Sequence, residues 1–172
     1  MNIKSGNLTL SAMFMALGVI VPVLFHAVGL GSMFLPMFWP MAACVFFLPV
    51  RYAISVGLLT PVISFFLTGM PPISPPILQL MMGELFMLTL AAGLFYRYTR
   101  WGLFWVILAG LTVSRFTLFL LVMPFAGILG LPPALASSAV IIKGIPGIAL
   151  IVVLVPILVN RLKGEKIWGL RK

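Results

Sequence analysis

The chain has 172 residues, of which 63% are hydrophobic and only 8% are charged. Soluble domains carry about 25% charged residues, so this composition excludes a water-soluble globular protein and predicts an integral membrane protein. The formal net charge of +9 does not indicate nucleic-acid binding. Most Lys and Arg residues flank apolar runs, which is typical of membrane proteins, and no basic patch is interleaved with exposed aromatic residues.

Apolar runs separated by Pro, Gly and charged residues follow one another along the whole chain. A membrane-spanning helix needs about 20 mainly apolar residues, so the length permits about six helices and leaves no room for a soluble domain. The first run is longer than a signal-peptide core of about 7–15 residues, and we interpret it as a retained helix. We predict one all-α membrane domain over residues 1–172, with helices at 8–28, 37–50, 52–68, 77–96, 101–125 and 135–159.

The connections between these helices alternate in charge. The connections 29–36, 69–76 and 126–134 contain no Lys or Arg. The other connections and the two chain ends carry the cations Lys4, Arg51, Arg97, Arg100, Arg161, Lys163, Lys166, Arg171 and Lys172. Because Lys and Arg are enriched on the cytoplasmic side of membrane proteins, we predict six transmembrane helices with both termini in the cytoplasm.

Three ionisable residues lie inside apolar runs: Glu84, Arg115 and Lys143, each on a different predicted helix. At 1.5 Å per residue, they lie about 10–15 Å below the outer ends of their helices. A charge at mid-bilayer costs at least about 2.5–3.5 kcal/mol, so such residues usually face the bundle interior and have partners. One interpretation is a buried salt bridge that only fixes helix packing, although it would leave one cation unpaired, which is costly in a dry site.

The other interpretation is a polar site, open to the outside, that binds a small molecule with an anionic group. Arg115 and Lys143 would hold the anion, and Glu84 would accept a hydrogen bond or orient one of the cations. Gln79 lies about one turn above Glu84, and His26 is at the outer end of the first helix. The apolar body of a ligand would suit aromatic and Met residues that could equally face lipid, namely Phe34, Met37, Phe38, Trp39, Met70 and Phe86.

The sequence contains few side chains that could take part in catalysis or bind a metal ion. The sequence has no Asp, one His and one Cys, which excludes a Ser-His-Asp triad. No His and Glu residues stand at metal-binding spacing, and no Gly-rich phosphate loop follows a strand. We therefore expect no enzymatic activity, no metal site and no cofactor, and we expect Cys44 to be a small buried hydrophobe.

Two stretches of the sequence carry a resemblance to a known family. The first helix contains "SAMFMALG", in which Ala12 and Ala16 share one face and would let another helix approach closely. The segment "FLPMFWPMAACVFFLPVRYAISVGLLTPVISFFLTGMPPISPP" (34–76) resembles the substrate-binding S components of energy-coupling factor (ECF) transporters, most specifically over 58–72. The family pattern is only partly kept, since Pro49 and Ala53 stand where glycine is frequent. The stretch 143–162 is also similar, and the resemblance covers essentially the whole chain.

This resemblance implies a role in vitamin uptake. Members of the family have six helices with cytoplasmic termini, lie in the plasma membrane of prokaryotes and capture a vitamin or related micronutrient from outside. Their partners are a transmembrane coupling subunit and two cytoplasmic ATPase subunits, and an AxxxA pattern matching Ala12 and Ala16 contacts the coupling subunit. The family ligand lies in the outer half, where Glu84, Arg115 and Lys143 are predicted. Pantothenate is a first candidate, while folate, a cobalamin precursor, a hydroxymethylpyrimidine and a queuosine precursor stay open.

Two other functions fit the same residues. One is a self-contained, proton-coupled secondary carrier of a small organic anion that uses Glu84. Such carriers are often longer and contain inverted repeats, and no convincing repeat is present in this sequence. The other is a membrane scaffold without transport activity, in which the buried charges serve only helix packing.

Overall fold

A computed structural model describes residues 3–125 and 144–164, and within these ranges the regular secondary structure is entirely helical. Five helices are long and apolar enough to cross a membrane, which supports the predicted multi-pass membrane protein. They are α1 (Ile3–Ala27), α4 (Val50–Thr68), α5 (Ile77–Tyr98), α6 (Leu103–Phe125) and α8 (Ile145–Gly164). Two short helices, α2 (Gly31–Phe34) and α3 (Phe38–Cys44), connect α1 to α4.

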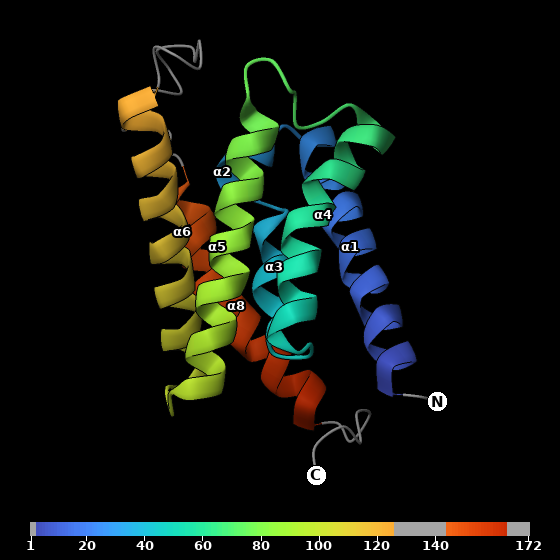
Figure 1. The fold of residues 1–172 in the computed structure, drawn as a ribbon, viewed down its shortest axis with the longest axis vertical. Coiled ribbons are helices and arrows are strands. Elements are labelled where there is room, and N and C mark those ends of the chain that lie inside the picture. The colour runs from blue at the N-terminus through green and yellow to red at the C-terminus, as the bar shows by residue number, and fades with distance from the viewer. Residues whose placement is uncertain (1–2, 126–143, 165–172) are drawn as a thin grey trace.

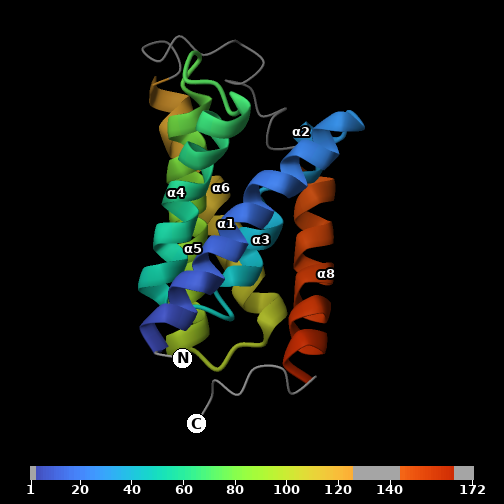
Figure 2. The same cartoon turned by 90° about the vertical axis from the view of Figure 1, so that its right-hand side faces the viewer.

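The long helices run along the long axis of the molecule (Figure 1). The start of α1 and the end of α8 lie at one end, which we call the terminal end, and residues 69–76 join α4 to α5 at the opposite end, which we call the loop end. Helix α5 packs between α4 and α6, while α1 packs against α4 and α3. In the perpendicular view, α3 lies between α8 and the layer formed by α4 and α5 (Figure 2).

The segment predicted as one helix over 37–50 is broken, and that prediction is wrong in its length. The helix occupies only Phe38–Cys44, and it is preceded by Leu35 in the left-handed region, with φ 50° and ψ 52°. Pro36 accounts for the break before α3, because a residue before proline is disfavoured in the right-handed helical conformation, and Leu35 precedes Pro36. Residues 45–48 form a turn after α3, and Pro49 directly precedes α4.

The other predicted helices agree with the structure to within a few residues at most ends. Helix α1 begins five residues before the predicted Leu8, and α4 begins at Val50 instead of Tyr52. The predicted last helix starts at residue 135, outside the described residues, and α8 continues past the predicted end at Val159 to Gly164. Its last turn carries Arg161 and Lys163. The helix can extend past the apolar run because long basic side chains can follow an apolar surface while their charged groups stay in water.

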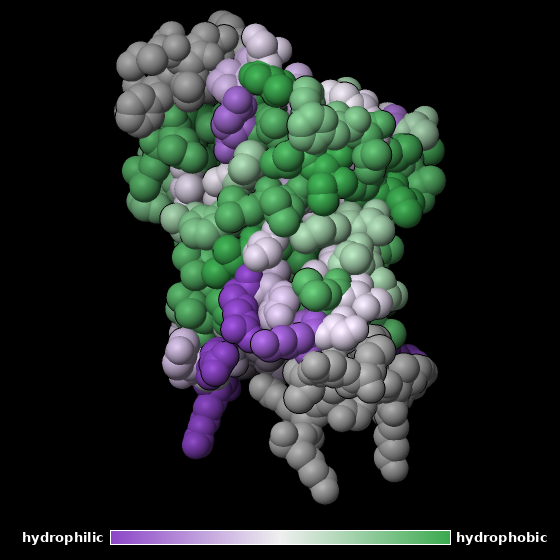
Figure 3. Space-filling view, turned by 45° about the vertical axis from the view of Figure 1, so that its right-hand side comes forward, coloured by the Kyte–Doolittle hydropathy of each residue, from purple (hydrophilic) through white to green (hydrophobic). Residues whose placement is uncertain are grey.

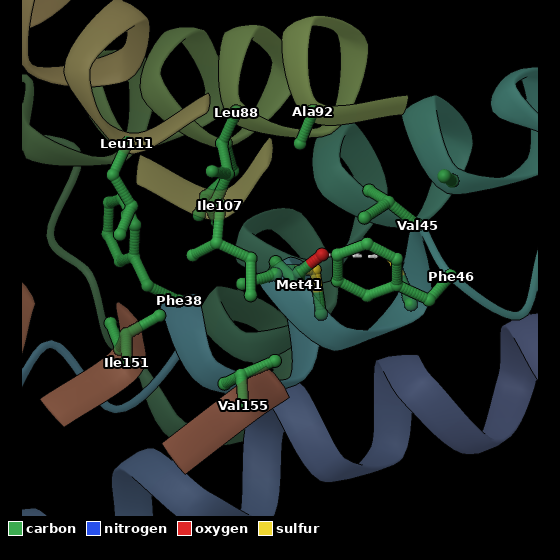
Figure 4. Close-up of a cluster of buried hydrophobic side chains, with 14 of the residues drawn as sticks. Phe38, Met41, Val45, Phe46, Leu88, Ala92, Ile107, Leu111, Ile151 and Val155 are labelled. Atoms are coloured by element: carbon green, nitrogen blue, oxygen red, sulfur yellow. Dashed lines mark hydrogen bonds between the residues drawn. The ribbon is translucent and has the colours of Figure 1, made fainter. Parts of the chain in front are cut away.

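The short helix α3 forms the centre of the apolar core. Its residues Phe38, Met41, Ala42 and Cys44 are buried, which confirms the expectation for Cys44. Side chains of α5, α6 and α8 converge on α3 (Figure 4), namely Leu88, Ala92, Ile107, Leu111, Ile151 and Val155. A helix that is apolar on all sides is suited to such a central position.

The surface between the two ends is apolar. A broad hydrophobic region covers the middle of the molecule, and hydrophilic residues gather towards the ends (Figure 3). The exposed large hydrophobic side chains come from all five long helices, for example Ile20, Phe66, Leu94, Phe116 and Val153. Such a surface is unsuited to water and fits the interior of a bilayer.

The last turn of α8 is fastened at the terminal end by an aromatic cluster. Lys163 Nζ donates a hydrogen bond of 2.8 Å to the hydroxyl of Tyr96 on α5. The ammonium also lies 4.8 Å from the Tyr96 ring centroid and 5.6 Å from that of Phe46, which follows α3. The rings of Phe46 and Tyr96 meet edge to face, with their centroids 4.9 Å apart.

Two glycines permit close backbone contact between helices. A Cβ atom at Gly57 on α4 would lie 2.8 Å from the Leu85 carbonyl oxygen on α5. A Cβ atom at Gly147 on α8 would lie 2.7 Å from the carbonyl carbon of Phe34 on α2. Since backbone atoms cannot move aside as a flexible side chain can, these contacts fix how α5 lies on α4 and how α8 lies on α2.

Replacing Gly57 by Ala should therefore destabilise the protein, because the added methyl group forces α4 and α5 apart. Overpacking of this kind costs about 1–3 kcal/mol. The measurement is the midpoint of thermal unfolding in mild detergent. Gly102→Ala is the matched control, since a Cβ atom there meets nothing within 4 Å. Equal midpoints for the two variants would show that the α4–α5 contact does not depend on Gly57.

Candidate functional site

Glu84 on α5 and Arg115 on α6 form an ion pair inside the helical bundle. Arg115 Nη1 lies 3.0 Å from Glu84 Oε1, and the two side chains are 11% and 5% exposed. Glu84 is seven residues from the start of α5, which places it about 10 Å from the loop end. Arg115 is ten residues before the end of α6, about 15 Å from the same end.

The packing of α5 against α6 brings these two residues together. Glu84 lies on the buried face of α5 together with Leu80, Leu88 and Ala92, which are spaced by about one helical turn. Gly110 of α6 permits the close approach, because a Cβ atom there would lie 2.8 Å from Ala92 Cβ. A residue on this face cannot point to lipid, so the carboxylate of Glu84 meets the neighbouring helix.

A third element, α3, supplies an aromatic ring to the site. The Arg115 guanidinium carbon Cζ lies 4.7 Å from the ring centroid of Phe38, which is 2% exposed. A cation over an aromatic face is stabilised by about 2 kcal/mol or more when it is shielded from water. Arg115 is therefore held by a carboxylate from α5 and by a ring from α3.

Several polar atoms of the site have no hydrogen-bond partner among the described residues. They are Glu84 Oε1, Ser114 Oγ, Arg115 Nε and Arg115 Nη2, and all four atoms are buried. The Glu84–Arg115 contact is thus a close approach of opposite charges without a well-directed hydrogen bond to Oε1. Buried polar atoms are nearly always paired in folded proteins. An arginine with unpaired donors in this position can bind a further acceptor.

Of the five predicted substrate-binding residues that the structure describes, it brings together two, Glu84 and Arg115. Lys143 lies outside the described residues. Gln79 is exposed one turn from Glu84, and His26 is exposed at the end of α1, where its ring packs on Gly31. Trp39 is half-buried, and its Nε1 donates a hydrogen bond of 2.9 Å to the Phe34 carbonyl oxygen. Among the described residues, no hydrogen bond or ion pair joins any of these three side chains to the Glu84–Arg115 pair.

Two residues of the site were not singled out by the sequence. Phe38 was one of six aromatic and Met residues considered as lining, and nothing in its local sequence marked it as the partner of a cation. Ser114 is not among the predicted site residues, although a polar residue next to Arg115 in the apolar run "LTVSRFTLFL" is a signal for it. Its side chain is fully buried.

Ala12 and Ala16, the predicted contacts with a coupling subunit, are exposed on α1. Leu8 and Ile20 continue the same line at four-residue spacing and are 61% and 54% exposed. The line faces away from α3 and α4, the main neighbours of α1. The role of the two alanines remains a prediction.

No family model, curated protein or solved structure matches this chain. In the part of the chain that the structure describes, no three His, Cys, Asp or Glu side chains are grouped so that they could hold a metal ion. The chemistry of the site therefore follows from the ion pair, the ring of Phe38 and the unpaired donors of Arg115.

Removing one charge of the buried pair should destabilise the protein more than removing both. Breaking a buried ion pair from one side costs about 3–5 kcal/mol, because the remaining charge is left unpaired in an apolar region. We expect Glu84→Gln and Arg115→Met each to lower the midpoint of thermal unfolding in detergent, and the double variant to recover part of that loss.

Arg97→Met is the control for this cycle, because Arg97 is an exposed cation in the last turn of α5. Its effect should stay within about 0.5 kcal/mol, as for most surface substitutions. Additive losses in the Glu84–Arg115 double variant would contradict an energetic coupling between the two side chains.

Proposed function

We propose that this protein captures a small micronutrient with an anionic group from outside the cell and delivers it to an ATP-driven transport module of the ECF type. The observation that carries the proposal is Arg115, whose buried Nε and Nη2 atoms lack hydrogen-bond partners among the described residues although Nη1 contacts Glu84. A residue that served only to pair Glu84 would not need further donors in an apolar region.

The proposal includes six membrane crossings with both termini in the cytoplasm. The broken segment with α2 and α3 is the second crossing, since it leads from the end of α1 at the loop end to the start of α4 at the terminal end (Figure 1). The cations Arg51, Arg97 and Arg100 flank helix ends at the terminal end, as expected for a cytoplasmic side. The loop end then faces outside, and the Glu84–Arg115 pair lies in the outer half of the membrane.

The exposed line on α1 supports the partner that we propose. Ala12 and Ala16 offer small side chains on a face that no other described helix covers, and small residues allow another helix to come close. A transmembrane coupling subunit would dock there, and two cytoplasmic ATPase subunits would supply the energy. After capture, the docked protein would tilt in the membrane of a prokaryotic cell and expose its ligand to the cytoplasm.

The first test is the identity of the bound molecule. We expect protein purified in mild detergent and then denatured to release a small anion in about equimolar amount, detected by mass spectrometry, and we expect Arg115→Ala to lose it. Arg97→Ala is the control and should retain it. An empty wild-type protein that shows no thermal shift with any vitamin would contradict capture and favour the scaffold. Uptake by the purified protein alone in liposomes, driven by a proton gradient, would favour a secondary carrier.

The second test concerns docking. Ala12→Leu with Ala16→Leu should abolish co-purification with the coupling subunit and ATP-dependent uptake, because the larger side chains keep the two helices apart. Ligand binding by the isolated variant should not change. Ala149→Leu, an exposed alanine on α8, is the matched control and should leave both properties intact. Unchanged uptake in the double variant would place the partner on another face.

A further inference from the structure

We infer that the substrate is a monocarboxylate, held by the edge of the Arg115 guanidinium that carries Nε and Nη2, and that Phe38 is the positioning residue for this edge. The inference rests on the proposed function and adds to it the class of anion, the two donor atoms and a residue that controls their direction. It depends on three features of the site, which are the edge of Arg115 that carries Nε and Nη2, the ring of Phe38 and the negative charge of Glu84.

The free edge follows from the contacts of the three guanidinium nitrogens. Nη1 is 3.0 Å from Glu84 Oε1, while Nε and Nη2 are buried and have no hydrogen-bond partner among the described residues. The N–H bonds of Nε and Nη2 are parallel and match the two oxygens of a carboxylate, which gives a bidentate contact. A primary amide offers one acceptor and one donor, so it cannot accept both hydrogen bonds in this way.

The ring of Phe38 restrains how the guanidinium can turn. Cζ of Arg115 lies over this ring at 4.7 Å, and Phe38 is itself almost fully buried in the core. Glu84 holds the guanidinium at Nη1, and the ring covers it from α3. With both contacts in place, the edge with Nε and Nη2 keeps one direction, and such preorganisation lowers the entropic cost of binding.

Charge restricts the number of negative groups that the described residues of the site, Glu84 and Arg115, can accept. Glu84 and Arg115 sum to zero, so a carboxylate brings this pair to −1 and a dianionic phosphate to −2. The interaction between charges is strong in a buried site because the effective dielectric constant is low. The carboxylate of Glu84 would repel a second negative charge close to Nη2. A single carboxylate on a largely uncharged body is therefore the anion that fits.

The experiment compares acids with their neutral counterparts on the full-length protein in mild detergent. The probe pairs are pantothenate and panthenol, nicotinate and nicotinamide, biotin and biotinamide, and lipoate and lipoamide. If the molecule released from the purified protein lies outside these pairs, its acid and its primary amide are used. Thermal stabilisation selects the pair, and titration calorimetry gives both dissociation constants. We expect the acid to bind at least about tenfold more tightly, as for hydrogen bonds to a charged group.

Variants distinguish binding by the Nε–Nη2 edge of Arg115 from an effect of positive charge alone and from an effect of core packing. Arg115→Lys keeps the positive charge but has no planar fork, and it should lose most of the preference for the acid. Phe38→Leu should reduce the ratio of acid to neutral affinity severalfold while binding of the neutral compound changes little, and Phe38→Tyr should restore the ratio. Phe46→Leu is the control, because Phe46 is a buried aromatic residue in contact with the exposed Lys163, and it should leave the ratio unchanged.

The outcomes distinguish this inference from the proposed function. Equal affinity for an acid and its neutral counterpart, or full retention of the preference in Arg115→Lys, would overturn the carboxylate edge and leave capture intact. A released molecule without a carboxylate would do the same. An unchanged ratio in Phe38→Leu would remove the positioning role. If no compound binds and nothing is released from the wild-type protein, capture itself fails.

Discussion

The ion pair between Glu84 and Arg115 is the interaction on which the arrangement of the bundle depends. In a chain with so few charged residues, two opposite charges inside apolar helices must face each other, because the lipid side offers neither water nor a counter-charge. This requirement fixes the rotation of α5 and α6 about their axes, and the close contact of Gly110 with Ala92 fixes their separation. The same pair then attracts the ring of Phe38, which defines where α3 must lie.

The broken segment with α2 and α3 links this pair to the rest of the molecule. Phe38 at the start of α3 lies under Arg115, and four residues earlier the backbone of Phe34 meets Gly147 of α8 without room for a side chain. The prolines of this segment prevent a continuous helix and so allow it to turn between these two contacts. The same short segment therefore contacts both the Glu84–Arg115 pair and α8.

The long helices, and Glu84 and Arg115 as candidate site residues, could be identified from the sequence for physical reasons. Long apolar runs have few alternatives to a helix in a membrane, and a charge inside such a run has to point inward. The connection predicted at 29–36 contains the break before α3, but the end of this helix at Cys44 instead of residue 50 was not predicted, because the packing that buries this short helix comes from α1, α4, α5 and α8. Phe38 was one of 14 Phe residues, and only the fold selects the one beneath Arg115. Gln79 and His26 are exposed, since polar residues near helix ends can remain in contact with water at little cost, and their part in binding stays a prediction.

Arg115 and Lys163 both contact aromatic rings, and a comparison of the two cations supports Arg115 as the proposed ligand-binding residue. Lys163 at the terminal end donates to Tyr96 and is exposed, so water can satisfy the rest of its ammonium. Its contacts with Phe46 and Tyr96 attach the end of α8 to the rest of the bundle, and this structural role is sufficient to explain them. Arg115 also lies over a ring, but it is buried, and its carboxylate partner engages only one of its nitrogens. Packing alone does not require an ion pair here, because apolar side chains of similar volume in place of both Glu84 and Arg115 would fill the space without leaving polar atoms unpaired. A largely buried cation whose donors lack partners among the described residues supports the proposed ligand more than a role limited to the stability of the bundle.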